Sequence, residues 1–427
     1  MQFAEKQNVC YKSPEVINRT VSLIIQVWVA FLILGCASSH EVLVSQDSPY
    51  RSIDSLKVGT ILHVPTGLEV SKLQLFDLLA DRRIVYVGEA HTNLAHHQVQ
   101  LEILQGMEAR HPGRVALGME MFNRSAQPVL DRWMAGDLDD KSFLKEWYAN
   151  WTSEYGYYKA ILEFAHEKKI PVVALNAADE LVRDLSEKGL EGLSEEIRKQ
   201  IPDLDPNDPF HRQALAAAFR GHARMGSAQE PDPKAFDRFY QTMLLWDETM
   251  AQSVVEYLNS PSGQNRYMVV MAGGFHVGYG FGIPRRVFRR LPVNYAIVLP
   301  QTDEIPEGRE DLRMGVVPPK LPLYIADFVW KTRFENLEDK QVRLGVFLVK
   351  TEKGVTIREV SPGSSADKAG LKAGDVITAL DDEQIKETFD LTYLVRQKKP
   401  GDKALLKILR DNQPKEVEVT FQPLIHP

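Results

Sequence analysis

Cysteine is nearly absent from this chain, which has only Cys10 and Cys36 among its 427 residues. Long basic runs are absent as well: no stretch of Lys and Arg is long enough to follow a phosphate backbone, and the formal net charge is −7. This charge pattern argues against nucleic acid as a partner. The longest nearly uncharged apolar run, residues 21–34, is too short for a comfortable membrane span.

The first residues of the chain are typical of an export signal. A polar, basic lead precedes the apolar run, and small residues follow it. Residues 33–36, Ile-Leu-Gly-Cys, resemble a bacterial lipobox, in which the thiol is lipidated and becomes the first residue of the mature protein. We therefore interpret residues 1–36 as a lipoprotein signal peptide with Cys36 as its lipidation site, which removes Cys10 and leaves no disulfide. The alternative is an uncleaved signal anchor, and both interpretations place the globular part outside the inner membrane.

Residues 37–70 are polar and irregular, and we expect them to form a tether with one short edge element at 60–64. The residues after Cys36 lack the aspartate that acts as a retention signal in similar lipoproteins, which favours the outer membrane, facing the periplasm. From residue 71 the chain alternates apolar runs with long stretches of helical spacing, the pattern of βαβ units. We expect an α/β domain over 71–332, with a mainly parallel sheet flanked by helices and a helical insertion.

Several apolar runs are expected to form strands of this sheet. They are 84–87, 115–119, 172–175 and 268–272, with 323–330 as a closing strand. Two insertions interrupt the alternation: 131–169, which is rich in Trp and Tyr, and 179–260, which is charged and helical with a breaker at 226–233. Aromatic residues at helical spacing more often form ordinary core than the wall of a cofactor site.

Polar residues that can bind metal or transfer protons directly follow the first four strands. Glu89 and His91 follow the first, Glu120 the second, Asn176 the third and His276 the fourth. Because the carboxyl ends of parallel strands open onto one crevice, we expect His91, Glu120 and His276 to meet there. A carboxylate is costly to bury unless it is paired, so Glu89 and Glu120 each either hold a neighbouring group or act in proton transfer or metal ligation.

A helix is expected to begin after the first GxxH turn, with Asn93 as its cap. On this helix His97 shares the apolar face that is directed at the sheet, whereas His96 is turned well away from it. His97 is therefore either a cofactor ligand near His91 or a satisfied core histidine.

The chain around His276 is rich in glycine, which allows the backbone to approach a ligand closely. Tyr279 is close enough in sequence to share the pocket. Arg285 lies at the start of an expected helix, where it can bind a carboxylate or propionate, although a solvated basic helix end is the more common outcome.

Several motifs occur in the order found in a known family. They are GEAH with the later His97, GMEMF at 118–122, the Trp/Tyr segment ending in Tyr157 and Tyr158, LNA at 175–177, WDETMA at 246–251 and AGGFHVGYGFGIPRRV at 272–287. Together they resemble the ChaN-like haem-binding lipoprotein family over roughly residues 70–332. The wider group of that family includes the TIKI metalloproteases and erythromycin-esterase-like hydrolases.

The resemblance implies that haem binds at the carboxyl edge of the sheet, in a homodimer that sandwiches two haems. The family's haem arrangement is a tyrosine axial ligand with a nearby histidine, and tyrosinate suits ferric iron. The tyrosine candidates in this chain are Tyr157, Tyr158 and Tyr279. The other residues of the expected cofactor site are His91, His97, His276 and Arg285.

After a linker at 333–341, residues 342–424 alternate short strands with turns around one helix at 389–398. This part resembles a bacterial-type PDZ domain: RLGV at 343–346 matches its carboxylate-binding loop, and SPGSSADKAGLKAGDVI at 361–377 is the most specific stretch. The resemblance implies that Leu344, Gly345 and Val346 hold the terminal carboxylate of a peptide that binds as an added strand.

Two functions are compatible with this sequence. The first is a cell-envelope lipoprotein that holds haem or another iron-containing ligand in its α/β domain and engages a protein C-terminus through its PDZ domain. The second is an esterase or peptidase in which Glu89 or Glu120 is the general base, with His91 and His276 as ligands of a divalent metal where one is used. Holding a ligand and activating water need the same residue types, so the sequence does not choose between them.

Overall fold

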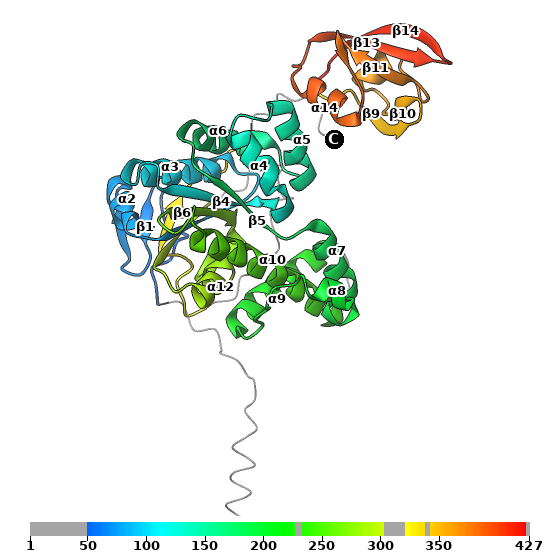
Figure 1. The fold of residues 1–427 in the computed structure, drawn as a ribbon. Helices are drawn as coiled ribbons and strands as arrows, with labels where there is room; N and C mark the ends of the chain where they lie inside the picture. Colours follow the sequence, from blue (N-terminus) through cyan, green and yellow to red (C-terminus); the bar gives the residue numbers. More distant parts are fainter. Residues whose placement is uncertain (1–48, 227–232, 303–320, 338–341, 424–427) are drawn as a thin grey trace, which may run out of the picture. The chain divides into compact units, whose positions relative to one another are not determined.

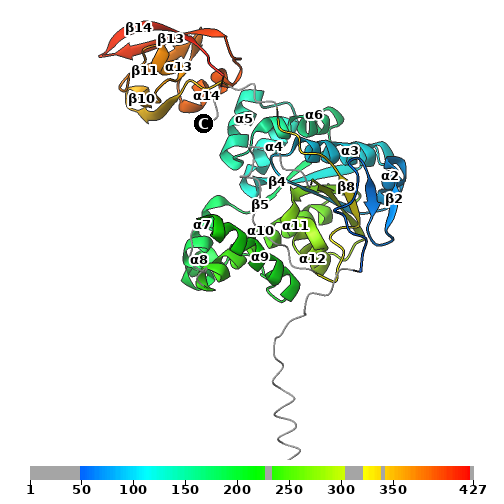
Figure 2. The ribbon, with the colours of Figure 1, turned by 180° about the vertical axis from the view of Figure 1, so that it is seen from behind.

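In a computed structural model of the protein, residues 49–226, 233–302, 321–337 and 342–423 are described. Figures 1 and 2 show the ribbon from opposite sides. The described residues form two β-sheets, each at the centre of its own domain. The predicted lipidation site, Cys36, lies outside the described residues. Among the helices that the structure describes, none is long and apolar enough to cross a membrane.

The first domain is built on an eight-stranded sheet with the strand order β2-β1-β8-β7-β3-β6-β4-β5. Strands β8 to β5 in this order pair in parallel, and β1 pairs antiparallel with both β2 and β8. The strands are β1 (Ile61–His63), β2 (Leu68–Val70), β3 (Ile84–Glu89), β4 (Val115–Asn123), β5 (Val172–Asn176), β6 (Tyr267–Gly273), β7 (Tyr295–Gln301) and β8 (Phe328–Lys331). The predicted α/β class with a mainly parallel sheet is confirmed.

Two features of this sheet differ from the sequence prediction. Strand β7 was not expected, because its apolar run ends at Pro300 and merges with a proline-containing stretch that has the composition of a loop. The end of the predicted tether belongs to the sheet, since β1 lies between β2 and β8 instead of at the edge. The first domain therefore begins before residue 71.

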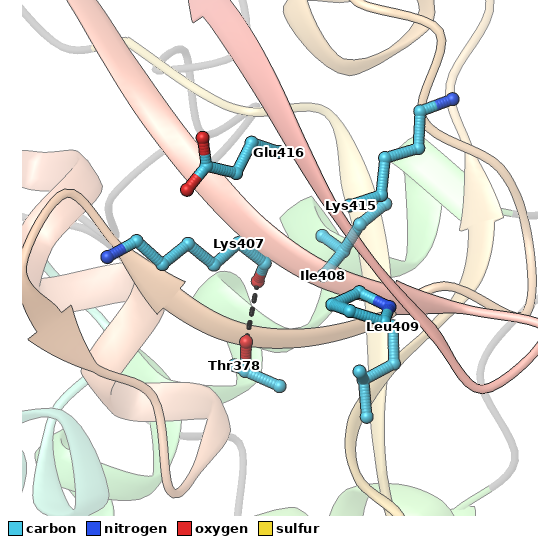
Figure 3. A pocket seen from close by; sticks show the side chains of 7 residues that line it. Thr378, Lys407, Ile408, Leu409, Lys415 and Glu416 are labelled. Atoms are coloured by element: carbon cyan, nitrogen blue, oxygen red, sulfur yellow. Dashed lines mark hydrogen bonds between the residues drawn. The ribbon is translucent and has the colours of Figure 1, made fainter.

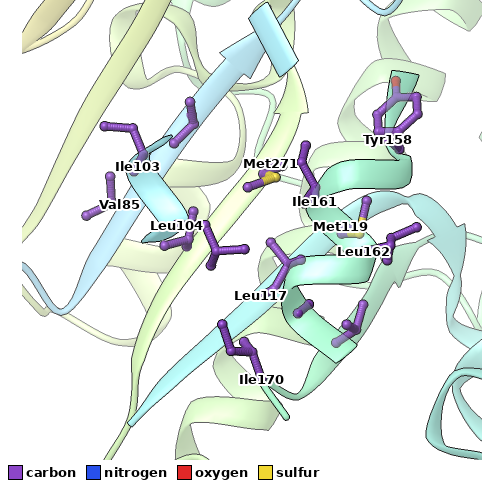
Figure 4. Packing of buried hydrophobic residues seen from close by; sticks show 14 of the residues in the cluster. Val85, Ile103, Leu104, Leu117, Met119, Tyr158, Ile161, Leu162, Ile170 and Met271 are labelled. Atoms are coloured by element: carbon purple, nitrogen blue, oxygen red, sulfur yellow. The ribbon is translucent and has the colours of Figure 1, made fainter. Parts of the chain in front are cut away.

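Helices cover both faces of the sheet, because neighbouring side chains of a strand point to opposite sides. Val85 and Val87 of β3 pack in a core with α2 to α6, which Figure 4 shows in part, while Ile84 and Tyr86 pack in a second core with α10 and α12. The helices are α2 (Lys72–Ala80), α3 (Leu94–Arg110), α4 (Gln127–Met134), α5 (Asp140–Asn150), α6 (Lys159–Lys168), α10 (Pro233–Asn259), α11 (Gly274–Val277) and α12 (Ile283–Arg290).

The two predicted insertions are helical. The aromatic one supplies Trp133, Trp147 and Tyr158 to the first core, which confirms that most of its aromatic density is ordinary packing. The second insertion consists of α7 (Asp179–Lys188), α8 (Glu195–Arg198), α9 (Pro209–Gly226) and α10. Most of its predicted breaker, residues 227–232, lies outside the described residues.

The second domain has a six-stranded antiparallel sheet in which β14-β13-β11-β10-β9 are neighbours and β12 pairs with β11. Its elements are β9 (Val346–Thr351), β10 (Gly354–Val360), α13 (Ser365–Lys368), β11 (Val376–Leu380), β12 (Glu383–Gln384), α14 (Thr388–Arg396), β13 (Lys403–Arg410) and β14 (Gln413–Thr420). The predicted strands and helix are all present, and α13 and β12 were missed because they are so short.

A pocket of about 290 Å³ on this sheet has Lys407 and Lys415 among its lining residues, and there Thr378 Oγ1 donates to the Lys407 carbonyl (Figure 3).

Candidate functional site

The structure brings His91, Glu120 and His276 together, because β3, β6 and β4 are adjacent and parallel. Glu120 Oε1 lies 3.4 Å from His276 Nε2. A Cβ added to Gly273 would lie 3.0 Å from His91 Cε1 and 3.6 Å from Glu120 Oε2. These three side chains therefore surround one point at the end of β6, as the strand-end pattern predicts.

Glu89 is the buried support of this site. Its carboxylate accepts hydrogen bonds from His91 Nδ1 (2.6 Å), Tyr158 Oη (2.6 Å) and Gln100 Nε2 (2.7 Å). Burial alone would raise the pKa of Glu89, but the charge of His97 and the hydrogen bond from His91 outweigh it and lower the pKa to about 2. Glu89 is therefore a buried anion at neutral pH, held by three donors.

His91 presents its other ring nitrogen outwards. Because Nδ1 donates to Glu89, Nε2 is left for a ligand, and the side chain is 39% exposed. The ring meets Trp151 edge to face, with 5.0 Å between the centroids. Burial lowers the pKa of His91, but the hydrogen bond to Glu89 and the negative charge of Glu89 raise this pKa overall. A carboxylate on Nδ1 and an open Nε2 is the usual arrangement of an imidazole that binds a metal centre.

His276 also has a carboxylate on Nδ1, but it is buried. Its Nδ1 donates to Asp247 Oδ1 (2.8 Å), and its Nε2 faces Glu120. Burial opposes the charged form, yet Glu120 and Asp247 together raise the pKa of His276 to about 9. Glu120 Oε2 in turn accepts the Gly273 amide at 2.6 Å. His276 is thus a buried cation between two carboxylates.

Asp247 was missed by sequence reasoning, because it lies in the middle of α10 and far from any strand end. It is fully buried, and its second oxygen, Oδ2, lies 3.7 Å from Nε2 of the buried His211. The only sequence signal for it was the WDETMA motif, which the family resemblance supplied without a role.

The histidines of α3 lie behind the site. The predicted cap is confirmed, since Asn93 accepts from the Ala95 amide. His97 is 2% exposed and its ring nitrogens face Gln100 Oε1 and the His91 carbonyl, so it acts on the site through its neighbours. The prediction that His96 turns away from the core was wrong: it is 5% exposed, accepts from the Ala90 amide and contacts Thr302, whose segment covers that face of the helix.

The three predicted tyrosines differ in their surroundings. Tyr158 is fully buried, and its hydroxyl donates to Glu89, which together with burial raises its pKa far above the usual range. Tyr279 stacks on Phe281, with its backbone at φ 55°. Tyr157 is half-buried, its ring lies 5.5 Å from that of His97, and its hydroxyl accepts from the Leu337 amide (3.4 Å).

Arg285 lies on α12 as predicted, but its guanidinium pairs with Asp205 (3.3 Å) and Asp208 (3.6 Å) of the second insertion. Part of its charge is therefore already compensated. The predicted divalent-metal site has no preformed ligand set, because the described residues contain no group of three or more His, Cys, Asp and Glu side chains placed to hold a metal ion.

The donor at His91 is compatible with the expected haem. Iron in a porphyrin needs one or two protein ligands, and His91 offers an open, carboxylate-supported Nε2. Phe275, on α11 directly after β6, is 42% exposed.

Comparison with known proteins identifies both domains. Residues 75–287 match the family described as haem-binding uptake, Tiki superfamily, ChaN, and residues 342–421 match the PDZ domain family. The structure titled "Cofacial heme binding to ChaN of Campylobacter jejuni" is 15% identical and covers 63% of this chain and 95% of its own, with a TM-score of 0.49.

Two relatives each match part of the chain. Protein RETICULATA-RELATED 5, chloroplastic, of Arabidopsis thaliana is 24% identical over 288 residues, or 64% of this chain and 37% of its own. The periplasmic pH-dependent serine endoprotease DegQ of Escherichia coli (strain K12) is 32% identical over 153 residues, or 36% of this chain and 28% of its own. The match thus spans 37% of the first relative and 28% of the second. The chain carries a domain of the ChaN haem-binding family followed by a PDZ domain.

Proposed function

We propose that the protein is a cell-envelope lipoprotein that binds haem, or another iron-containing ligand, at the carboxyl edge of its first sheet. The observation that carries this proposal is the pair Glu89 and His91, which lies within the matched ChaN domain and leaves Nε2 of the imidazole open. Haem iron would supply the redox and ligand-binding chemistry, and the protein would supply its position.

Tyr157 is the tyrosine best suited to stand beside this histidine. Tyr158 would have to give up its hydrogen bond to Glu89 and leave the core, and Tyr279 lies stacked on Phe281. Tyr157 is half-buried, and its hydroxyl receives a single long hydrogen bond from a backbone amide. Of the two tyrosines whose hydroxyl is hydrogen-bonded, Tyr157 therefore has the one that is easier to release.

A haem titration of the full mature protein tests this function. We expect a Soret band to shift on addition of haem, and we expect His91→Ala to weaken binding more than Tyr157→Phe. His166→Ala is the matched control, because His166 is exposed on α6, where its ring lies beside that of Trp133. Absence of any spectral change with wild-type protein at micromolar haem would end the proposal.

The second domain is proposed to bind a protein C-terminus. Its Leu344–Val346 loop is held by hydrogen bonds from the Ser361 amide to the Gly345 carbonyl and from the Ala366 amide to the Leu344 carbonyl. Strand β9 is the last strand of its sheet path, so its outer side is open to an added strand. Binding of decapeptides with free carboxyl ends, and loss of binding on amidation, would support this role.

The lipid anchor and its location are proposed from the sequence alone. Metabolic labelling with palmitate, followed by fractionation of the envelope, should place the wild-type protein in the outer membrane, and Cys36→Ser should abolish labelling. The implied homodimer is tested by sedimentation velocity of the mature protein with and without haem.

A hydrolase is the second candidate, favoured by one observation. Two imidazoles, His91 and His276, each carry a buried carboxylate on Nδ1. Glu120 lies 3.4 Å from His276 Nε2 and shares with His91 the space beside Gly273. Such pairs can exchange protons with a bound water. Metal analysis with an esterase and peptidase screen distinguishes the two functions, because haem binding without turnover of any substrate would exclude this one.

A further inference from the structure

The segment 333–337, which we call the strap, lies along the loop that carries His91. It follows β8 directly. The Glu335 amide donates to Asn93 Oδ1 (3.0 Å), and the Glu335 carbonyl accepts from the Leu94 amide (2.7 Å). The strap thus satisfies the first amide of α3, which has no partner within the helix.

Both ends of the strap are also attached. At its start, Thr302 Oγ1 lies 2.7 Å from Thr332 Oγ1 and 3.0 Å from both Asn93 Nδ2 and His96 Nε2. At its other end, the Leu337 amide donates to the Tyr157 hydroxyl.

Leu337 packs tightly where it reaches the aromatic insertion. A Cβ on residue 156 would lie 2.6 Å from Leu337 Cδ2, so the absence of a side chain at Gly156 leaves room for the strap. The strap therefore occupies the hydroxyl of Tyr157 and fixes the loop two residues beyond His91 at the same time.

We propose that the strap is a releasable latch that regulates haem binding by holding the Tyr157 hydroxyl and the His91 loop. This inference rests on the proposed haem function. In the closed state the Tyr157 hydroxyl accepts a hydrogen bond from the chain itself, and the His91 loop is held through Asn93. Release of the strap frees the hydroxyl for iron and lets the loop adjust around a ligand.

The strap leads directly to the PDZ domain, and this connection offers a way to regulate the strap. The matched PDZ family begins at residue 342, only five residues beyond Leu337, and a chain of that length spans at most roughly 18 Å. A partner that fixes or moves the PDZ domain therefore acts on the strap through a short tether. Its three hydrogen bonds to the site loop and Tyr157 involve its backbone, so they can break without disturbing either core.

Glu335→Pro and Glu335→Ala in the full mature chain form a matched pair. The side chain of Glu335 is exposed, so alanine keeps every strap hydrogen bond, whereas proline removes the amide that donates to Asn93. We expect proline to speed amide exchange of Leu94 and to raise the haem association rate severalfold, and alanine to change neither. Leu337→Pro, which removes the donor to Tyr157, should act in the same direction.

The opposite change should slow binding. A disulfide between Gly156→Cys and Leu337→Cys would lock the strap, and we expect slower haem association that a reductant restores. Equal haem association rates for the Glu335→Pro and Glu335→Ala proteins would overturn the proposal, even if Leu94 exchange differed, because the strap would then be a helix cap only. Failure of the wild-type protein to bind haem would instead remove the function on which the proposal rests.

Discussion

His91 is fixed by Glu89 through a hydrogen bond of 2.6 Å between Nδ1 and Oε1. The two residues are neighbours across one end of a strand, yet one is buried and the other is 39% exposed on its side chain. Glu89, the buried residue, sets the orientation and the protonation of His91. A substitution at Glu89 should therefore alter a side chain that a ligand can reach.

Glu89→Gln should weaken both folding and haem binding. The amide replaces an anion that three donors surround, and its NH₂ group would face a donor, which costs about 3 kcal/mol of unfolding free energy. Urea denaturation and the haem titration measure the two effects. Glu163→Gln is the control, because Glu163 is 59% exposed and makes only a surface pair with Lys159. Equal losses in the two variants would contradict the role of Glu89.

Gly273→Ala should disturb the ligand site with little effect on stability. The added methyl group would lie 3.0 Å from His91 Cε1, so the imidazole must shift, while the backbone of Gly273 suits any residue. We expect haem binding to weaken by about tenfold, which corresponds to roughly 1.4 kcal/mol.

Gly278→Ala provides the comparison for this change. A methyl group there meets only Ile325 Cγ1, at 4.0 Å, so haem binding should stay as in the wild type. If both alanine variants bind haem normally, the approach of His91 to Gly273 has no part in ligand binding.

Stability should fall as the pH rises from 6.5 to 9. The pKa of His276 is raised to about 9 in the folded state, so its contribution is fully present below the unfolded value of 6.5 and is lost on the way up to 9. The loss is of the order of 3 kcal/mol, and the raised pKa of His91 adds to it with the same sign. Denaturation curves at several pH values measure it.

Asp247→Asn tests the cause of this pH dependence. Removing the carboxylate that accepts from His276 Nδ1 should lower the pKa of the imidazole and flatten stability over that interval. Asp237→Asn on the same helix is the control, since Asp237 is exposed and pairs with Arg212. A pH dependence that is unchanged in Asp247→Asn would show that another group causes it.

At the acid end, Glu89 should act in the opposite sense. Its pKa is lowered to about 2, so its contribution is present above the unfolded value of 4.5 and is lost as the pH falls towards 2. The Glu89→Gln protein should therefore lose less stability than the wild type between these two values, and circular dichroism during acid titration would detect the difference.

The strand-end residues were predictable because strand direction alone determines where they lie. His91, Glu120 and His276 each follow an apolar run, and parallel pairing brings such positions to one edge whatever the helices between them do. Asp247 could not be found this way, because its place depends on how α10 packs on the sheet. His96 was misplaced because the buried stripe of α3 runs through His96, Gln100, Ile103 and Met107, next to the stripe of His97, Leu101 and Leu104 that helical spacing suggested.

The strap illustrates the same limit. Residues 333–341 have the composition of a linker, and nothing in their order indicates that the Glu335 backbone would pair with Asn93 and Leu94. Backbone contacts of this kind leave no side-chain pattern, so only coordinates can reveal them.

Gly345→Ala should unfold or disable the second domain without affecting haem binding by the first. Gly345 has φ +80°, a conformation that costs other residues about 1–2 kcal/mol, and its added methyl group would lie 2.2 Å from Ser364 Cβ. Gly401→Ala separates the two causes, since Gly401 has φ +90° but open space around it. We expect Gly345→Ala to destabilise the domain more than Gly401→Ala and to abolish peptide binding, as measured by calorimetry of the full chain. Equal destabilisation by both variants would mean that backbone strain alone matters and that the contact between the carboxylate loop and Ser364 can relax.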